Sequence, residues 1–568
     1  MSTISPEDVA RRREALERSL GAWRPRTLAS AFDDAVARFP DRPYVITDAT
    51  TLTYAQVAEQ SRRVAAGLIA LGVRRGDRVA MLVDNRVDYP VLKFAIARTG
   101  AIAVALNYSY RGEEIVQRLA QAGASVLISI DASTATDFLA VFDERFDGWD
   151  ANAGDDLHSD DAPTLRRIVL VEDGWRDGAL TIPALAQRGD VQAVDAASAG
   201  VSADDVADIV FTSGTTGHAL GAELTHDMLL RSAYGSAYHR AFDDGWRIGF
   251  ALPLYHVFGY VEGMLAAMFV SGAIVPQRVF NPRTTLEQIQ RHRINEVLFV
   301  PTMTVAVVDQ AVKGSFDLSS LQSVFSAAAP APVWLWKRVM TDLNPEMIFT
   351  GYGQTEVSAA TALTHPGDTI ETVSAVVGAF KRGGLAATDA SGLLAEYRTV
   401  DPFDGHPLPD GAEGELVVRG PQVTRGYVGE DAPAALDADG WLRTGDLGVV
   451  DEHGYIRLRG RSKELFKVGG ELVAPSEVEQ VLSGADGVSQ VYVAGIPDER
   501  YGEVGWAWVV PAEGAQLDAR ALVAHARAHL APFKVPRGIT FAAVEDLPMT
   551  TTGKIQKYLL VASMTDRR

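Results

Sequence analysis

The sequence predicts an α/β protein with a large N-terminal domain of several subdomains and mainly parallel sheets. From about residue 28, amphipathic helices alternate with short apolar strands, as in the helix expected at 64–71 and the strand expected at 78–83. This alternation is typical of parallel sheets covered by helices. The length of 568 residues exceeds what one hydrophobic core normally supports, so at least two domains are expected.

The next elements expected are a helix at 91–99 and a strand at 101–106. From about residue 390 to 460 the pattern changes to short strands between glycine turns, which predicts a small β-rich unit. We assign this unit to the end of an N-terminal domain spanning residues 1–460. Residues 461–568 are expected to form a separate α+β domain, with helices near 475–483 and 517–530 and strands near 488–494 and 504–510.

The composition favours a globular protein that acts on small molecules. The net charge of −20 argues against nucleic acid or an anionic membrane as the main partner. The absence of cysteine excludes disulfides, thiolate nucleophiles and Cys-type zinc sites. Proline and glycine break the apolar stretch 250–276, so we expect a buried strand, loop and helix there and no membrane span. Without a signal peptide pattern at its start, the chain is expected to be cytoplasmic, as a monomer or homodimer.

The sharpest local signal is FTSGTTG at 211–217. An apolar strand at 208–211 leads into a segment of hydroxyls and glycines, where successive N–H groups can point at one anion. A simple glycine-rich turn is the competing interpretation. The segment is not the loop GxxxxGK followed by serine or threonine, and the dinucleotide fingerprint GxGxxG is absent.

Other motifs follow the loop in order. They are LTH at 224–226, PLYHVFG at 253–259, GYGQTE at 351–356, RTGDLG at 443–448, GRSKE at 460–464 and TTGKI at 551–555. With TSGTTG, they closely resemble the superfamily of acyl-CoA synthetases, non-ribosomal peptide adenylation domains and beetle luciferases. The resemblance covers residues 52 to 555. It implies a ligase that activates a carboxylic acid with ATP as an acyl-adenylate, and a C-terminal domain that is mobile.

The resemblance implies a catalytic centre at which a carboxylate attacks the α-phosphate of ATP. Two anions meet there, so the site has to supply positive charge. Lys554 of TTGKI is implied to bridge the carboxylate and the α-phosphate. Thr355 is implied to contact the α-phosphate, and Glu356, with Thr216, to bind Mg²⁺, which prefers hard oxygen ligands.

Other residues are implied to bind the nucleotide. Asp446 matches the carboxylate that accepts both ribose hydroxyls, and Arg461 matches a second ribose contact. SAAAP at 326–330 replaces a Gly-Gly-Ala-Pro adenine loop, so that a slightly tighter loop is expected. The full set implied to bind ATP or coenzyme A is Thr212, Ser213, Gly214, Thr215, Thr216, Gly217, Ala327, Ala328, Ala329, Pro330, Gly351, Tyr352 (near the adenine), Gly353, Gln354, Asp446, Arg461, Lys463, Lys467, Gly469 and Gly470.

His256 matches the family's histidine at the carboxylate site, although a histidine on an apolar stretch is often a structural residue. Amino-acid-activating relatives carry an acidic residue near here for the substrate amine, and the nearest one in this chain is Glu262. This favours a fatty, aryl or other amine-free acid. Candidate pocket residues by position in the family, whose apolar character points to a medium-chain or aromatic acid, are Tyr255, Phe258, Gly259, Thr302, Met303, Ala327 and Val357.

The phosphate loop departs from the family at one position. Relatives continue SGTTG with Pro-Lys-Gly, whereas this chain continues with His218, Ala219, Leu220 and Gly221, so that Leu220 occupies the lysine position. In relatives that lysine helps hold the β- and γ-phosphates. The departure predicts weaker ATP binding or slower adenylation, but not inactivity.

The segment 460–479 implies a second half-reaction. Lys463 occupies the hinge about which the C-terminal domain rotates after adenylation. Rotation would remove Lys554 and bring Gly469 and Gly470 to the acyl group, leaving room for the pantetheine arm of coenzyme A. The segment is also typical of a turn before a helix, and the two interpretations are compatible.

The leading hypothesis is an ATP-dependent acid–CoA ligase that uses Mg²⁺. One alternative is an adenylate-forming ligase that passes the acyl group to an amine. A second alternative, prompted by Leu220, is a degenerate homologue that binds nucleotide without catalysis. It is opposed by the retention of Lys554, Glu356, Asp446 and Arg461.

Overall fold

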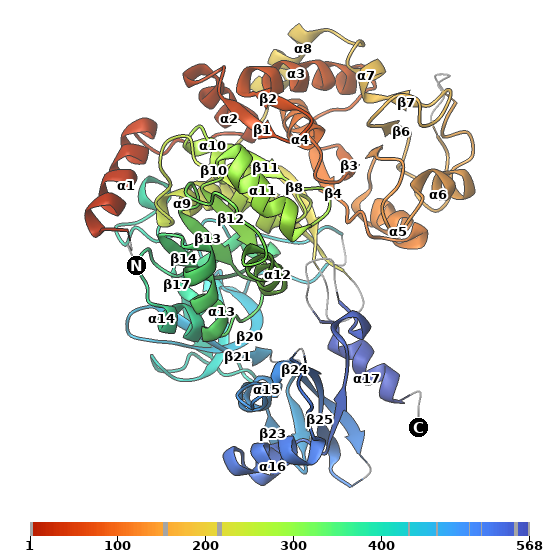
Figure 1. Cartoon of the computed structure of the whole chain (residues 1–568). Helices are drawn as coiled ribbons and strands as arrows, with labels where there is room; N and C mark the ends of the chain where they lie inside the picture. The colour runs from red at the N-terminus through yellow and green to blue at the C-terminus, as the bar shows by residue number, and fades with distance from the viewer. Residues whose placement is uncertain are drawn as a thin grey trace. The chain divides into compact units, whose positions relative to one another are not determined.

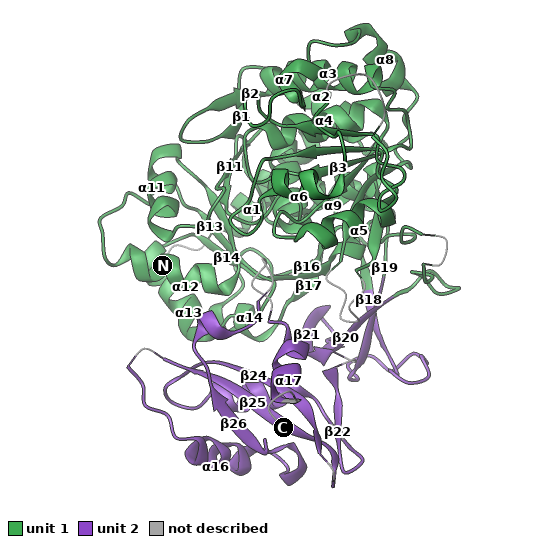
Figure 2. Cartoon of the chain, turned by 90° about the vertical axis from the view of Figure 1, so that its right-hand side faces the viewer, with its two compact units in different colours: residues 1–396, 419–442 green, residues 397–418, 443–568 purple. Residues whose placement is uncertain are grey.

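The structure is a computed structural model. It describes residues 4–151, 157–212, 219–429, 432–461, 464–498, 500–512, 514–549 and 555–565. The chain forms two compact units, drawn in different colours in Figure 2. The larger unit holds residues 1–396 and 419–442, and the smaller unit holds residues 397–418 and 443–568. The predicted domain boundary after residue 460 remains a prediction.

One sheet of the larger unit has the strand order β7-β6-β5-β3-β4-β8-β9. All neighbouring strands are parallel except β8 and β9, which form an antiparallel pair. Strands β4 and β5 are buried along their whole length, which explains their continuous apolar sequences. The bounds are β3 Arg78–Leu82, β4 Ile102–Ala105, β5 Val126–Ser129, β6 Arg167–Leu170, β7 Leu180–Thr181, β8 Val206–Phe211 and β9 Gly221–Thr225.

A second sheet has the order β14-β13-β12-β10-β11-β1-β2 and is also parallel, apart from the antiparallel pair β1–β2. Its bounds are β1 Pro43–Ile46, β2 Thr51–Thr53, β10 Arg247–Phe250, β11 Ala273–Pro276, β12 Glu296–Phe299, β13 Ser323–Ser326 and β14 Met347–Phe349. An antiparallel set completes the larger unit, with β15 Gly351–Gln354, β16 Ala359–Leu363 and β17 Gly378–Phe380.

Helices cover the parallel sheets (Figure 1). Helix α3 begins with a capping box, because the Thr53 side chain accepts from the Gln56 N–H and the Gln56 side chain accepts from the Thr53 N–H. Helices α3, α4 and α8 pack against one another. The bounds are α1 Pro6–Leu20, α2 Leu28–Arg38, α3 Tyr54–Ala70, α4 Asp88–Thr99, α5 Gly112–Ala122, α6 Phe138–Arg145, α7 Ile182–Leu185, α8 Val191–Ala199, α9 His226–His239, α10 Ala266–Phe269, α11 Pro282–His292, α12 Pro301–Ala311, α13 Val333–Arg338 and α14 Ile370–Ala375.

The apolar stretch 250–276 folds as predicted, into buried elements. It continues from the end of β10 through a loop into a π-helical turn, η1 Phe258–Leu265, then α10 and β11. None of the helices in the described part of the chain is long and apolar enough to cross a bilayer.

The smaller unit begins with four strands in the order β21-β20-β19-β18. These are β18 Glu396–Val400, β19 Gly414–Arg419, β20 Leu442–Val450 and β21 Tyr455–Arg461. A second sheet has the order β23-β22-β25-β24, with β26 parallel to β25. Its elements and helices are β22 Phe466–Val468, β23 Glu471–Val473, α15 Pro475–Ser483, β24 Val488–Asp498, β25 Gly502–Pro511, α16 Ala519–His529, β26 Gly538–Phe541 and α17 Lys557–Thr565.

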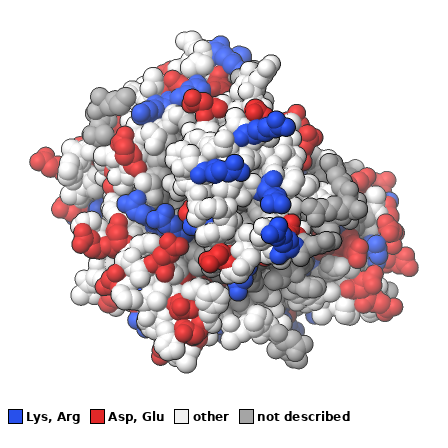
Figure 3. Space-filling model, turned by 90° about the horizontal axis from the view of Figure 1, so that it is seen from below, with Lys and Arg blue, Asp and Glu red and all other residues white. Residues whose placement is uncertain are grey.

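The predicted fold class is confirmed: the chain combines parallel α/β sheets, a small antiparallel β-rich part and an α+β C-terminal part. The surface drawn in Figure 3 carries charges of both signs, with basic side chains near the centre of the view and acidic ones toward its edges. Locally basic surface therefore exists on a protein whose net charge is −20.

Candidate active site

The predicted phosphate loop begins where β8 ends, but its residues 213–218 lie outside the described residues. On either side of it, Phe211 pairs with Gly221, and the Thr212 N–H donates to the Leu220 carbonyl at 2.9 Å. The chain therefore leaves β8 and enters β9 at neighbouring points. The predicted phosphate contacts that lie outside the described residues are Ser213, Gly214, Thr215, Thr216 and Gly217.

The GYGQTE motif forms β15 and a tight turn that returns into β16. Its predicted nucleotide-binding members Gly351, Tyr352, Gly353 and Gln354 make up the whole of β15. A side chain on Gly353 is excluded, because its Cβ would lie 1.8 Å from the Ala359 carbonyl oxygen. The Gln354 amide lies 3.5 Å from the Tyr352 hydroxyl, and Tyr352 is 9% exposed.

Glu356, the predicted Mg²⁺ ligand, lies in the turn after β15, next to Thr355. The Thr424 N–H donates to the Glu356 carbonyl at 2.6 Å, and the Tyr427 hydroxyl donates to its Oε1 at 3.2 Å. Burial, together with the negative charge of Glu356, raises the pKa of Tyr427, so the phenol stays protonated and donates. Backbone and side chain of Glu356 are thus both held, while Thr355 is buried beside it.

The predicted adenine loop follows β13. Ala327 is buried and its N–H donates to the Phe299 carbonyl at 3.1 Å, whereas Ala328, Ala329 and Pro330 are exposed. Ala328 has a φ of 74°, in the left-handed region where a Cβ costs about 1–2 kcal/mol. Alanine in place of glycine therefore adds backbone strain at this position, in addition to the tighter loop that the sequence predicts.

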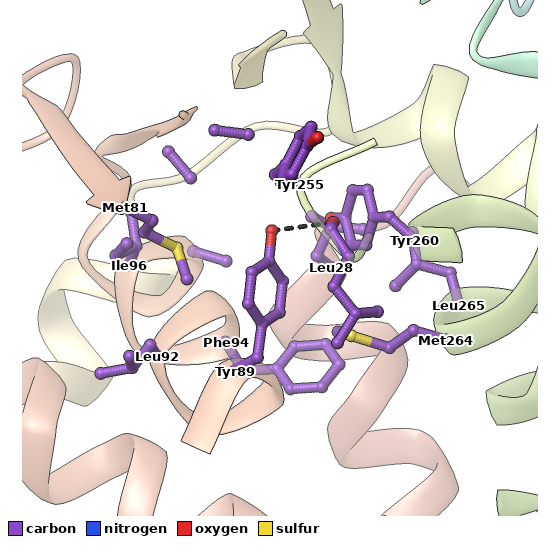
Figure 4. Close-up of a cluster of buried hydrophobic side chains, with 14 of the residues drawn as sticks. Leu28, Met81, Tyr89, Leu92, Phe94, Ile96, Tyr255, Tyr260, Met264 and Leu265 are labelled. Atoms are coloured by element: carbon purple, nitrogen blue, oxygen red, sulfur yellow. Dashed lines mark hydrogen bonds between the residues drawn. The ribbon is translucent and has the colours of Figure 1, made fainter. Parts of the chain in front are cut away.

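The PLYHVFG segment is anchored from α4 and from the loop between β3 and α4. The Asn85 amide donates to the Leu252 carbonyl at 2.9 Å and accepts from the Leu254 N–H at 2.8 Å. The Tyr89 hydroxyl donates to the Leu254 carbonyl at 2.8 Å, in the apolar cluster of Figure 4. The residues just before His256 are therefore fixed to the core.

His256 is half-buried and lies just before η1. The Phe258 N–H donates to its Nδ1 at 3.2 Å. Because Nδ1 accepts this hydrogen bond, the neutral imidazole carries its proton on Nε2. His256 can therefore present an N–H donor to a carboxylate without being charged.

The predicted pocket residues differ in character. Tyr255 packs edge-on against Tyr108 with 5.2 Å between ring centroids, and Phe258 packs edge-on against Phe325 at 5.1 Å. A Cβ on Gly259 would lie 2.8 Å from the Pro253 carbonyl oxygen, so this glycine serves close backbone packing. Of the other predicted pocket residues, Thr302 is exposed, Met303 is half-buried, and Ala327 and Val357 are buried.

Four buried charged side chains lie behind the GYGQTE turn, and no motif in the sequence indicated them as a group. The Glu262 carboxylate is 3.2 Å from Arg240 and 3.3 Å from the Lys381 amine, and it accepts from the Ala360 N–H at 3.1 Å. Arg240 also binds Glu296 at 2.7 Å. The signal in the sequence was the presence of single charged residues in otherwise apolar segments.

The pKa values of this group follow from burial and charge. Burial raises the pKa of Glu262, but Lys381 and Arg240 outweigh burial and hold it below its usual value. Burial lowers the pKa of Lys381 to about 8 and raises that of Glu296 to about 7. Glu262 is therefore ionised and fully engaged inside the protein.

In the smaller unit, the two predicted ribose contacts lie together. Asp446 on β20 pairs with Arg461 on β21, and the Arg461 Nε lies 3.1 Å from the Asp446 Oδ1. Asp446 is 5% exposed, and its N–H donates to the Thr444 hydroxyl at 3.1 Å. The arginine therefore fixes the orientation of the carboxylate.

The segment predicted to approach coenzyme A is a hairpin. Gly469 and Gly470 connect β22 to β23 with φ values of 60° and 94°, which require glycine for the turn itself. The side chain of Lys467 on β22 is exposed. Lys463 and Lys554 lie outside the described residues, so their predicted roles stay predictions.

No group of three or more His, Asp and Glu side chains able to hold a metal ion is present among the described residues. A Mg²⁺ site does not require one, since this ion usually binds through one or two carboxylates together with substrate phosphates. The Glu356 carboxylate offers oxygen atoms of that kind, and its role as a Mg²⁺ ligand remains a prediction.

Comparisons with known proteins agree over most of the chain. Residues 32–428 match the family described as AMP-binding enzyme, and residues 477–554 match the AMP-binding enzyme C-terminal domain. A propanoyl:CoA ligase of Mycobacterium tuberculosis, named for a methyl-dioxo-octahydro-indenyl group, is 36% identical over 94% of this chain and 98% of its own. A feruloyl-CoA synthase of Amycolatopsis sp is 33% identical over 89% of this chain and 93% of its own. The crystal structure of ATP-bound MatB from Rhodopseudomonas palustris is 26% identical, with a TM-score of 0.76 over 95% of this chain and 99% of its own.

Proposed function

Since the chain belongs to the family of AMP-binding enzymes and is an AMP-forming acid–CoA ligase, we propose that it activates an apolar, amine-free carboxylic acid at His256. ATP and coenzyme A are its other substrates. The acid first becomes an acyl-adenylate with release of pyrophosphate, and the acyl group then passes to the thiol of coenzyme A.

The burial of Glu262 is the observation that supports an amine-free acid as the substrate. It is the acidic residue nearest to His256 in the sequence, and its carboxylate is 1% exposed and bound by Arg240 and Lys381. Such a carboxylate is not available to pair a substrate amine. The aromatic side chains of Tyr255 and Phe258 on either side of His256 favour a medium-chain or ring-bearing acid. The ring systems in the names of the two relatives are compatible with this class.

We assign the polar residues by the chemistry that they offer. His256 donates through Nε2 to the substrate carboxylate, and Asp446, held by Arg461, accepts from the ribose hydroxyls. Thr355 contacts the α-phosphate, and Lys554 neutralises the carboxylate and phosphate as they meet.

Glu356 is proposed to bind Mg²⁺ together with Thr216. The residues present fit this ion, because the Glu356 carboxylate is held by the Tyr427 hydroxyl at 3.2 Å and offers hard oxygen ligands. When bound, Mg²⁺ would neutralise charge on the phosphates of ATP. Tyr427 orients the carboxylate for this role.

The test of the function is a panel of acids incubated with ATP, Mg²⁺ and coenzyme A. We expect pyrophosphate release and thioester formation with medium-chain and aromatic acids, and neither with their α-amino counterparts of equal size. Pyrophosphate release without thioester would instead point to transfer to an amine. A preference for the α-amino acids would contradict the interpretation that Glu262 is not available to pair a substrate amine.

The Leu220→Lys variant is expected to lower the KM for ATP, by about two- to fivefold, because a solvated ion pair contributes roughly 0–1 kcal/mol. Residue 220 is placed for this effect because it adjoins Thr212 at the start of the phosphate loop. Steady-state kinetics with saturating acid measures this, and Leu220→Met serves as the uncharged control. A KM equal to that of the unmodified enzyme would show that the missing lysine does not limit ATP binding.

A further inference from the structure

A buried ion pair joins helix α4 to strand β8. The Lys93 ammonium donates to the Asp208 carboxylate, and the two side chains are 2% and 0% exposed. Replacing a buried ion pair by apolar residues of similar volume is often neutral or stabilising, so stability alone does not account for these two charges. Their contacts with a third side chain indicate a role in positioning.

The ion pair holds Tyr260, a residue of η1, in two ways. The Lys93 ammonium lies 4.5 Å from the centroid of the Tyr260 ring, and the Tyr260 hydroxyl donates to the Asp208 Oδ2 at 3.2 Å. Burial raises the pKa of Tyr260 well above its ordinary value, so the hydroxyl keeps its proton and remains a donor. Figure 4 shows Tyr260 in the same cluster as Tyr89 and Tyr255.

Tyr260 is in turn bonded to the residue proposed to bind the acid. Its N–H donates to the His256 carbonyl at 3.1 Å, and the Phe258 N–H between them donates to the His256 Nδ1 at 3.2 Å. The chain is π-helical from Phe258 onward, a rare conformation that is found frequently at functional sites. A firm hold on the Tyr260 side chain therefore also fixes the turn that carries the imidazole.

Other contacts hold η1 further along the chain. The Glu262 carbonyl accepts from Arg240 at 2.7 Å, and the Met264 carbonyl accepts from the Tyr44 hydroxyl at 3.0 Å. Of these three anchors, the one at Tyr260 is nearest to the start of η1. It also comes from α4 and β8, and β8 belongs to the other parallel sheet of the larger unit.

We propose that Tyr260, held by the Lys93–Asp208 pair, is a positioning residue for His256 and thereby sets the affinity for the carboxylic acid. The inference rests on the proposed function, in which His256 donates through Nε2 to the substrate carboxylate. Asp208 fixes the Tyr260 ring, and the backbone hydrogen bond passes this position on to His256. A displaced imidazole makes a weaker hydrogen bond with the acid, because such bonds depend steeply on distance and angle.

The experiment measures the KM values for acid and for ATP in the Tyr260→Phe variant, with the fastest-reacting acid of the panel. This variant keeps the ring beside Lys93 and removes only the hydroxyl that donates to Asp208. The KM for the acid should rise about three- to tenfold, the range expected for one lost hydrogen bond, while the KM for ATP stays unchanged.

Tyr54→Phe is the matched control. Tyr54 is also buried, and its hydroxyl donates to the Gly272 carbonyl at 2.7 Å, just before β11. The control should lower the midpoint of thermal unfolding about as much as Tyr260→Phe does and leave both KM values unchanged. A rise in the KM for the acid of the same size in both variants would overturn the inference, because it would reflect a general loosening of the core.

A second comparison tests whether Tyr260 acts through His256. In a His256→Ala background, Tyr260→Phe should cause no further rise in the KM for the acid, because the residue that it positions is absent. A further rise there, an equal rise for acid and ATP, or an unchanged KM for the acid in Tyr260→Phe alone would each contradict the inference. If Tyr260→Phe does not fold, Lys93→Met combined with Asp208→Leu leaves neither charge unpaired and should raise the same KM.

The proposed function is tested by His256→Ala alone. An unchanged KM for the acid in that variant would refute the assignment of His256 itself. A raised KM in His256→Ala together with an unchanged KM in Tyr260→Phe would leave that assignment in place and refute only the positioning role.

Discussion

The Lys554→Ala variant is expected to lose about two to three orders of magnitude in the rate of adenylation, because a donor placed at the developing charge is removed. Reaction of a preformed acyl-adenylate with coenzyme A should continue at its usual rate, since the resemblance places Lys554 away from the acyl group in that step. Pyrophosphate release and thioester formation from acyl-adenylate, measured separately, give the two rates.

The residues around Lys554 help to interpret the comparison of the two half-reactions. Met549 pairs with Ile555, and the Gln556 N–H donates to the Pro548 carbonyl at 2.8 Å, so the ends of segment 550–554 are held together. Lys557, three residues further on, is bound by Glu464 at 2.9 Å and Glu479 at 2.8 Å, and it is not available to replace Lys554. An equal loss in both half-reactions would mean that the variant damages the fold of this unit instead of one catalytic step.

The order of helices and strands could be predicted because it depends on local patterns. The strand at 101–106 and the helix at 91–99 are confirmed as β4 and α4, with bounds that differ by a few residues. The pairing of strands could not be predicted in the same way. In the first sheet β3 lies between β4 and β5, so consecutive strands of the chain lie on opposite sides of it, and this order depends on contacts distant in sequence.

The residues of the candidate site also differ in whether local patterns could predict them. Motifs supplied Glu356, His256 and Asp446, since each stands in a short run of characteristic residues. Tyr427, which holds the Glu356 carboxylate, comes from a segment 71 residues away and carries no motif.

The Glu262→Leu and Lys381→Met variants are each expected to lose about 3–5 kcal/mol in the free energy of unfolding of the larger unit. Each removes one partner of a buried pair and leaves the other charge without compensation. Both side chains are 1% exposed or less, and they lie 119 residues apart in the sequence. Urea denaturation followed by tryptophan fluorescence measures the loss, and buried Trp246 and Trp336 make this signal sensitive to unfolding of the larger unit.

The double variant decides whether charge or volume causes the loss. Removing Glu262 and Lys381 together leaves Arg240 paired with Glu296, so the remaining buried charges balance. The double variant should therefore be more stable than the sum of the two single losses predicts, by about 2 kcal/mol or more. Losses that simply add would mean that packing, not charge pairing, accounts for them.

The same charges also determine how well the turn that carries Glu356 is positioned. Lys381 donates to the Ala360 carbonyl at 2.9 Å and to the Ser232 hydroxyl at 3.2 Å, and Ser232 donates to the Ser358 carbonyl at 2.6 Å. Because Ala360 pairs with Gly353 across the turn, loss of Lys381 loosens both sides of the Glu356 segment. The double variant should consequently recover stability but keep a raised KM for ATP, and a KM restored together with stability would limit the buried charges to a structural role.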